Sequence, residues 1–177
     1  MALLNKTVLK KVFSSLDHKL KTQLRLVVGG AGALILAYKY GLGTRDIDAI
    51  PVKSTLSMAE IERYAREIAM EFSLDYDWLN PYFQSFMHVL PRSYGERFIQ
   101  VYKGKHLEVF ALGPEDLLIL KCFAHREKDI GHARLLMRVC KNLDFVDHHL
   151  QKMLEEKIPN AEKACDFFDA IRSDLGL

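Results

Sequence analysis

Several features that mark common classes of protein are scarce or missing in this chain of 177 residues. Only three cysteines occur, widely spaced and without a C-x-x-C pair, so we expect reduced thiols rather than a disulfide framework or a cysteine zinc site. The longest apolar run, residues 26–38, is too short to cross a bilayer. The first 20 residues lack the apolar core and cleavage site of a signal peptide, so we expect a cytoplasmic protein with no membrane partner.

Charge of one sign is also scarce, because the net charge is only +2. Bulk electrostatics therefore give no reason to expect nucleic-acid binding, and any basic surface would have to be local. Two groups of basic residues could form one: Lys10, Lys11, Lys19, Lys21 and Arg25 early in the chain, and Lys121, Arg126, Lys128, Arg134 and Arg138 later. Neither G-x-S-x-G nor G-x-x-x-x-G-K-[ST] is present, which argues against a serine hydrolase and a P-loop protein.

What the sequence does contain is a clear alternation of helical and extended patterns, and its 49% hydrophobic residues suffice for a core. Apolar spacing and turn residues predict helices at 2–20, 31–41 and 54–74 and strands at 24–30 and 46–52. Residues 97–112 alternate about Lys103-Gly104-Lys105 and predict a β-hairpin. After Gly113 the pattern is helical throughout, in segments near 114–125, 128–141, 144–156 and 160–175.

This order of elements predicts an α/β (α+β) fold, with a small mixed sheet flanked by helices. We expect an α/β core over residues 1–112 and a helical C-terminal region over residues 113–177. The first helix is amphipathic and could dock internally or against a second subunit.

The pair Gly29-Gly30 stands where the first strand turns into a helix. Glycines let the backbone approach a phosphate closely, and the N–H groups at a helix start attract anions. A tight turn without any ligand gives the same pattern.

Asp46 and Asp48 stand two positions apart at the start of the second strand. Side chains at i and i+2 of a strand share a face, so the two carboxylates can hold one hard cation or a pair. Mg²⁺ uses few protein oxygens and completes its shell with substrate phosphates, and two such ions can clamp the oxygens of a phosphoryl displacement. A solvated acidic turn is the alternative.

The order of strand, Gly-Gly, helix, Thr-Arg and Asp-x-Asp resembles the signature of the nucleotidyltransferase superfamily that includes DNA polymerase beta. The stretch "GGAGALILAYKYGLGTRDIDAI" is most similar to AbiEii-type toxin nucleotidyltransferases and their bacterial relatives. By this resemblance Gly29, Gly30, Thr44 and Arg45 are expected to bind the nucleotide, and Asp46 and Asp48 are expected to hold Mg²⁺ as catalytic residues.

A second stretch, "PEDLLILKCFAHREKDIGHARLL", is similar to a later segment of the same family. The resemblance implies that Lys121 meets nucleotide phosphate or assists the acceptor hydroxyl, and that Arg126 and Asp129 orient it or bind nucleotide. A solvated helix lysine is the alternative for Lys121. His132 stands where relatives often have a second Asp.

Superfamily members that transfer a nucleotide usually have a third carboxylate on a later strand. Glu108 is the candidate here, and a solvent-facing hairpin residue is its alternative. Four residues of one segment, Trp78, Asn80, Tyr82 and Phe83, could stack on a base, although packing in the core is expected for at least two of them.

Two functions follow as hypotheses. The first is an Mg²⁺-dependent nucleotidyltransferase that moves an NMP group from an NTP to a hydroxyl of RNA or protein, in a bacterial toxin–antitoxin or phage-defence system with a cognate protein. The second is an inactive member of the fold that binds a nucleotide or a partner. The missing second Asp and the uncertain third carboxylate favour the second hypothesis.

Overall fold

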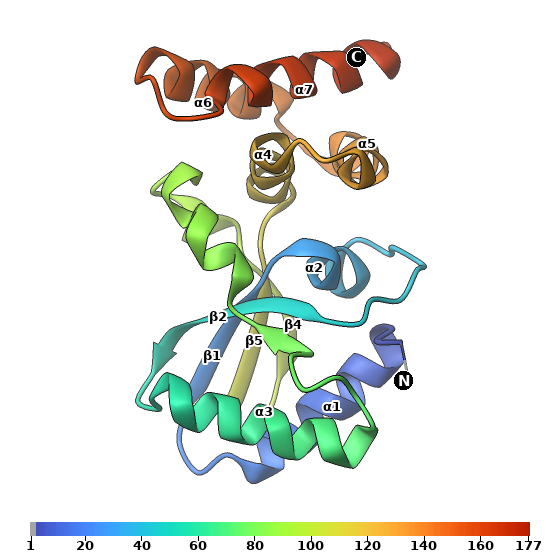
Figure 1. The fold of residues 1–177 in the computed structure, drawn as a ribbon, viewed down its shortest axis with the longest axis vertical. Coiled ribbons are helices and arrows are strands. Elements are labelled where there is room, and N and C mark those ends of the chain that lie inside the picture. Colours follow the sequence, from blue (N-terminus) through green and yellow to red (C-terminus); the bar gives the residue numbers. More distant parts are fainter. Residues whose placement is uncertain (1–2) are drawn as a thin grey trace. The chain divides into compact units, whose positions relative to one another are not determined.

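The structure is a computed structural model that describes residues 3–177, except for the side chains of Lys53 and Tyr82. Two compact units can be distinguished along the chain. The first comprises the residues up to Gln84 together with Phe98–Leu112, and the second comprises Ser85–Arg97 and Gly113–Leu177. The first unit holds the sheet and the second is helical (Figure 1).

A five-stranded mixed sheet with the order β3-β2-β1-β5-β4 forms the centre of the first unit. β1 pairs with β2 in antiparallel and with β5 in parallel orientation, while β3 joins β2 in parallel and β4 joins β5 in antiparallel orientation. The strands are β1 (Leu24–Val28), β2 (Ile47–Ser54), β3 (Leu79–Asn80), β4 (Ile99–Lys103) and β5 (Leu107–Ala111). Both predicted strands and the predicted hairpin are therefore confirmed, and β3 is an addition.

The two faces of this sheet differ in burial. Directly paired residues share a face, and one face carries Leu26, Val28, Ala49 and Val109, all at most 5% exposed. The other face carries half-buried residues on β2, β1 and β5, namely Asp48, Arg25, Glu108 and Phe110, around the buried Val27. We call this second face the polar face.

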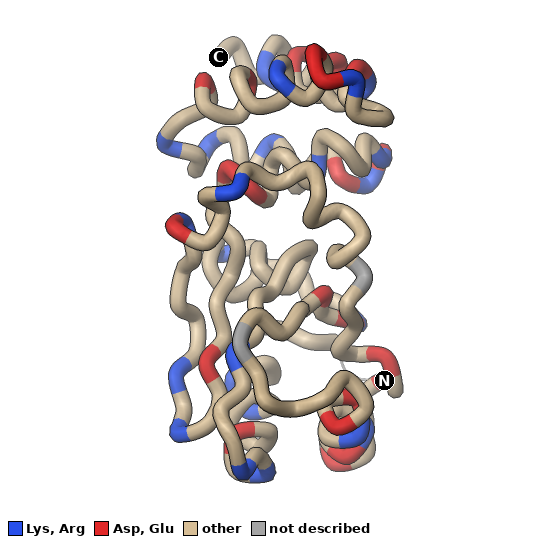
Figure 2. Tube along the Cα trace, turned by 90° about the vertical axis from the view of Figure 1, so that its left-hand side faces the viewer, with Lys and Arg blue, Asp and Glu red and all other residues tan. Residues whose placement is uncertain are grey.

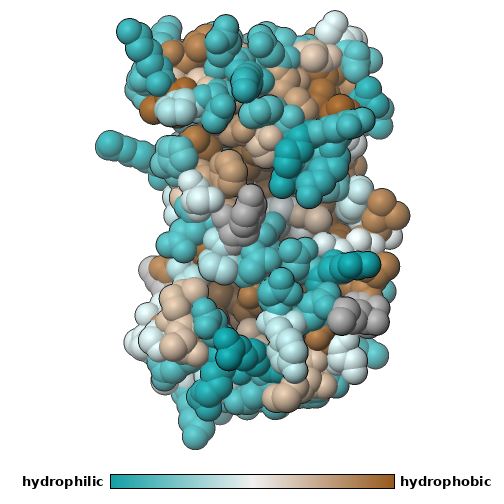
Figure 3. Space-filling model, viewed as in Figure 1, coloured by the Kyte–Doolittle hydropathy of each residue, from teal (hydrophilic) through white to brown (hydrophobic). Residues whose placement is uncertain are grey.

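Helices α1 (Lys6–Lys19) and α3 (Met58–Phe72) pack against each other in the first unit (Figure 1). Asn5 caps α1, since its Oδ1 accepts hydrogen bonds from the backbone N–H groups of Thr7 and Val8 at 3.0 and 2.9 Å. Ser57 and Glu60 form a reciprocal capping box at the start of α3. The outward side of α3 carries mostly hydrophilic residues together with the exposed Met58 and Met70, and Figure 3 shows both kinds of surface in this region.

The end of α1 is tied to the β4–β5 turn by one buried carboxylate. Asp17, 8% exposed, accepts hydrogen bonds from the backbone N–H groups of Lys105, His106 and Leu107 at 2.7–3.0 Å. Burial would raise the pKa of Asp17, but these backbone hydrogen bonds outweigh it and lower the pKa below its ordinary value. Gly104 is needed in the turn because a Cβ there would collide with the Asp17 carboxyl group.

The second unit confirms the four helices predicted after Gly113. These are α4 (Pro114–Ala124), α5 (Ile130–Val139), α6 (Leu143–Glu155) and α7 (Ala161–Asp174), with the short 3-10 helix η3 (Glu127–Asp129) before α5. Two further 3-10 helices, η1 (Tyr82–Val89) and η2 (Tyr94–Arg97), come before the hairpin.

Residues 85–97 group with the helices, whereas the sequence placed them in the α/β core. The reason is a pair of contacts with α4 and α6. Arg97 donates from Nε and Nη2 to the fully buried carboxylate of Asp116 at 2.8 and 2.7 Å. The ring Nε2 of His149 lies 2.8 Å from the carbonyl oxygen of Val89.

Within residues 3–177, no helix combines the length and the apolar character needed to cross a membrane.

Candidate active site

The turn between β1 and α2 (Gly30–Ala37) is built around two glycines. Gly30 has φ of +54°, a conformation that favours glycine, and a Cβ there would collide with Oδ2 of Asp48. The backbone N–H of Gly29 donates to the carbonyl oxygen of Asp48 at 2.8 Å. The glycine pair thus lets the start of α2 lie directly against Asp48.

Phe83 covers the other side of the turn. A Cβ on Gly29 would lie 3.0 Å from Cδ1 of Phe83, closer than ordinary packing allows. Gly29 is the N-cap of α2 and makes no side-chain cap hydrogen bond. The first N–H groups of a helix have no partner within the helix, so this turn offers backbone donors beside a carboxylate.

Asp46 and Asp48 stand on either side of the fully buried Ile47 at the start of β2. Asp46 is exposed and Asp48 is half-buried. Asp48 is the second residue of β2 and lies on the polar face, and Asp46 comes directly before the strand. The two carboxylates therefore meet at the point where the chain enters β2.

The contacts of Asp46 are long and come from neutral groups. Its Oδ1 accepts from the hydroxyl of Thr44 at 3.3 Å, and its Oδ2 accepts from the amide nitrogen of Asn80 at 3.2 Å. Thr44 is itself fixed by two backbone hydrogen bonds with Leu4, at 2.7 and 3.1 Å. Arg45, the neighbour of Thr44, is exposed. This arrangement orients Asp46 while leaving its oxygens able to bind a cation.

Mg²⁺ fits this pair of residues by its chemistry. It prefers carboxylate oxygens and takes one or two from the protein when substrate phosphates supply the rest. The close approach of the α2 start to Asp48 leaves room there only for glycine, and backbone donors suited to phosphate lie next to the carboxylate. Over residues 3–177, no group of three or more His, Cys, Asp or Glu side chains is placed to hold a metal.

Glu108 is not brought to the two aspartates. Glu108 pairs with Arg25 of β1, whereas Asp48 lies level with Gly29, four residues further along the chain. Four residues of a strand span about 13 Å, so Glu108 lies about that far from the level of Asp48 along the strands. Its Oε2 accepts from Nε and Nη2 of Arg25 at 2.9 and 2.5 Å. Glu108 shares the polar face with Asp48, but its geometry is that of an ion-pair partner rather than a third metal ligand.

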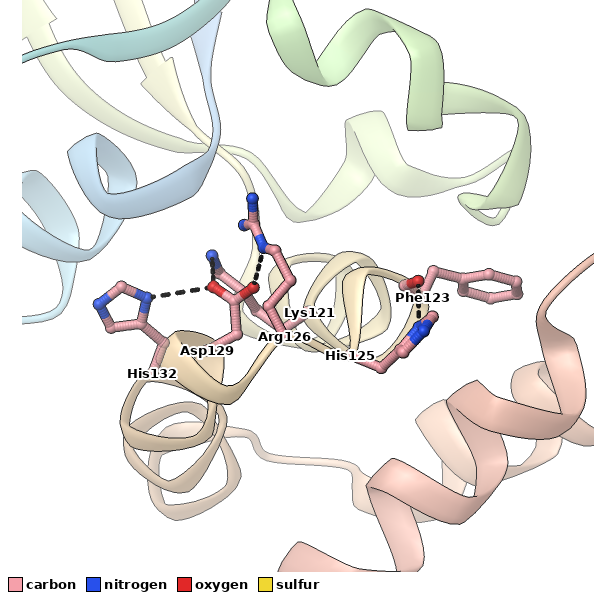
Figure 4. A network of polar contacts seen from close by, with 6 residues as sticks. All are labelled: Lys121, Phe123, His125, Arg126, Asp129 and His132. Carbon is pink, nitrogen blue, oxygen red and sulfur yellow. Dashed lines mark hydrogen bonds and ion pairs between the residues drawn. The ribbon is translucent and has the colours of Figure 1, made fainter.

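Lys121, Arg126, Asp129 and His132 form a network in the second unit (Figure 4). Nζ of Lys121 donates to Oδ1 of Asp129 at 2.6 Å, and Nε of Arg126 donates to Oδ2 at 2.6 Å. Nδ1 of His132 lies 3.6 Å from Oδ1. The side chains of Asp129 and Lys121 are 1% and 8% exposed, whereas that of Arg126 is 43% exposed.

The charge of Asp129 is held by its partners. Burial by itself would raise its pKa, but the neighbouring His132 and the hydrogen bonds from Arg126 and Lys121 outweigh burial and keep the pKa well below the ordinary value. Lys121 is therefore not a solvated helix lysine, and His132 faces Asp129 from one turn further along the chain. His125, by contrast, contacts the carbonyl oxygen of Phe123 at 2.9 Å (Figure 4).

The aromatic segment 76–83 contributes packing and one polar contact. Trp78 is 0% exposed and donates from Nε1 to the carbonyl oxygen of Ala65 at 2.8 Å, and Phe83 is 5% exposed. Both are core residues, as expected for at least two of the four, and the Tyr82 side chain lies outside the described part. Sequence reasoning missed the hydrogen bond from Asn80 to Asp46, because it depends on the pairing of β3 with β2.

A cavity of about 370 Å³ lies between α3, β2 and β3. Its walls include Leu26 and Ala49, which belong to the buried face of the sheet, and Asn80 borders it at the edge. The cavity is thus on the side of β2 away from Asp48.

The mixed sheet with its strand–Gly-Gly–helix–Asp-x-Asp arrangement has the fold of a nucleotidyltransferase, as predicted. A family model described as "Nucleotidyltransferase of unknown function (DUF6036)" matches residues 7–170, and the chain belongs to this family. Comparisons with curated proteins and with solved structures gave no significant match.

Proposed function

We propose that the protein is an Mg²⁺-dependent nucleotidyltransferase that moves an NMP group from an NTP to a hydroxyl group of RNA or protein. The observation that carries the proposal is the contact between the Gly29-Gly30 turn and Asp48. It sets the backbone donors at the start of α2 beside the carboxylate of Asp48, and Asp46 stands two positions earlier, directly before the strand.

In the reaction the acceptor hydroxyl oxygen bonds to the α-phosphorus of the NTP, pyrophosphate leaves, and the hydroxyl proton is lost to solvent or a base. Bound Mg²⁺ would neutralise the charge of the phosphates, and Asp46 and Asp48 would hold it. The N–H groups at the start of α2, from Gly30 on, would orient the phosphates, while the N–H of Gly29 holds the turn against the carbonyl oxygen of Asp48. Thr44 and Asn80 keep the Asp46 carboxylate in position.

The resemblance to AbiEii-type toxins suggests a setting in a bacterial toxin–antitoxin or phage-defence pair with a cognate protein. It also assigns Lys121 to the nucleotide phosphates or the acceptor, with Arg126 and Asp129 orienting it. The hydrogen bonds that Lys121 and Arg126 donate to the Asp129 carboxylate support this orienting role.

A second candidate is a protein that binds a nucleotide, or a partner, without transfer. One observation favours it: the expected third carboxylate, Glu108, is paired with Arg25 and is about 13 Å from the level of Asp48 along the strands.

Labelling with each α-³²P NTP, Mg²⁺ and either total RNA or cell lysate tests the proposal. Wild type should transfer label, Asp46→Asn and Asp48→Asn should lose transfer by at least about 100-fold, and both should stay folded. Asp77→Asn is the matched control, because Asp77 is an exposed aspartate elsewhere in the same unit.

If no acceptor is labelled while NTP with Mg²⁺ still raises the melting temperature, the binding protein is the correct alternative. Equal activity in the wild type and in both aspartate variants would contradict the site itself.

A further inference from the structure

The polar face carries a stacked group of aromatic and basic side chains beyond the two aspartates. The rings of Phe98 and Phe110 have centroids 6.0 Å apart, and Cζ of Arg25 lies 5.1 Å from the centroid of Phe110. Both rings are half-buried, and Gln100, which pairs with Phe110, is exposed beside them. Flat aromatic and guanidinium surfaces of this kind stack on bases without regard to sequence.

Three exposed lysines, Lys21, Lys103 and Lys105, lie where this face ends, and we call them the lysine tip. Lys103 pairs with Glu108 across the hairpin and so shares the polar face. The segment that contains Lys21 is held beside the hairpin, because Gln23 donates to the carbonyl oxygen of Lys105 at 2.9 Å. Figure 2 shows blue segments of the hairpin turn and of the end of α1 gathered at this end of the first unit.

Nearby carboxylates do not neutralise the lysine tip. The oxygens of Asp17 accept backbone hydrogen bonds, Glu71 pairs with Lys19 at 3.3 Å, and Glu108 pairs with Arg25. In the described part of the chain, none of the ion pairs includes a lysine of the tip. The tip is therefore a local excess of positive charge on a chain whose net charge is only +2.

The polar face thus has carboxylates at one end, a stacking surface in the middle and lysines at the other end. Asp48 and the level of Glu108 are about 13 Å apart along the strands, a span that a few nucleotides can cover. A single strand of nucleic acid offers both a row of phosphates for the lysines and base faces for the rings. A folded protein acceptor offers no such regular row of charge.

We propose that this surface binds single-stranded RNA and directs its terminal hydroxyl towards Asp46 and Asp48. The proposal rests on the nucleotidyltransferase function and selects RNA over protein as its acceptor. Phosphates would contact the lysine tip, and bases would stack on the Phe98–Phe110–Arg25 group.

The test is the affinity for a fluorescein-labelled, unstructured RNA of about 12 nucleotides, measured by fluorescence anisotropy over a range of salt concentrations. Replacement of Lys21, Lys103 and Lys105 by alanine should weaken binding by at least about tenfold and lower the slope of log Kd against log salt by about two. The matched control replaces the exposed lysines Lys141, Lys152 and Lys163 of the second unit by alanine, and it should bind like the wild type.

Equal weakening in both triple variants, or RNA binding unchanged by loss of the lysine tip, would overturn the proposal. Label transferred to protein and never to RNA would also overturn it, while leaving the nucleotidyltransferase function intact. Failure of that function would show instead as a wild type that transfers no label to either acceptor. Should the triple variant melt early, Lys103→Glu alone provides the same comparison at one exposed position.

Discussion

Asp129 in the second unit and Asp46 in the first unit are held in opposite ways. Asp129 is 1% exposed and both of its oxygens accept short hydrogen bonds from cations. Asp46 is exposed, and it accepts from the neutral groups of Thr44 and Asn80 at more than 3 Å. A carboxylate whose oxygens are already engaged stabilises its surroundings, whereas one with oxygens to spare can take up a cation. Burial and partners therefore separate a structural acid from a candidate metal ligand.

Among the variants that test this contrast, we expect Asp129→Asn to change the free energy of unfolding most. It leaves the buried ammonium of Lys121 without its counter-charge, so we expect a loss of about 3 kcal/mol in the free energy of unfolding, measured by urea denaturation. Asp174→Asn is the control, because Asp174 pairs with Arg134 at 2.8 Å on the surface, and it should cost less than about 1 kcal/mol. Equal losses in the two variants would contradict the assignment.

The same contrast predicts a dependence on pH. The pKa of Asp129 is lowered in the folded state, so its contribution is fully present above the unfolded pKa of about 3.9 and is lost as the pH falls further. The stability difference between wild type and Asp129→Asn should shrink as the pH falls below about 4. A difference that grows on acidification would have the wrong sign.

Asp17 sharpens the comparison within the first unit, because it is buried but accepts from backbone N–H groups rather than from cations. Asp17→Ala leaves these donors without an acceptor, and we expect a loss of about 2 kcal/mol, again from urea denaturation. Amide hydrogens of residues 105–107 should exchange faster in the variant. Unchanged exchange there would show that the carboxylate does not hold the turn.

Gly30→Ala affects the site and the stability together. The positive φ and the collision with Asp48 should lower the free energy of unfolding by about 1–2 kcal/mol and abolish stabilisation by NTP with Mg²⁺. Gly131→Ala is the matched control, since Gly131 lies in α5 with open space around its Cβ position, and it should be neutral or stabilising. Thermal melts with and without NTP measure both quantities.

The smallest change in stability is expected for Asp46→Asn. Its side chain is exposed and its contacts are long, so the free energy of unfolding should change by less than about 0.5 kcal/mol while transfer is lost. A large loss of stability would mean that Asp46 is structural, like Asp129.

Features fixed by neighbouring residues could be predicted from the sequence. The capping box of α3 links Ser57 and Glu60, and the turn at Gly29-Gly30 follows from adjacent glycines. Features that depend on distant pairing could not. The partner of Glu108 is 83 residues away, and Asn80 reaches Asp46 across 34 residues. For the same reason the sequence did not show that residues 85–97 belong to the second unit. Their position depends on the ion pair between Arg97 and Asp116, which are 19 residues apart.

The position of β1 in the sheet has a consequence for synthesis on the ribosome. β1 pairs on one side with β2, which soon follows, and on the other with β5, which begins only at Leu107. Until β5 emerges, a growing chain would expose one open edge of its central strand, and such edges pair readily with other chains. Chaperone contact with the nascent chain should therefore be strongest before residue 111 is released and should decline once the parallel pairing closes the sheet.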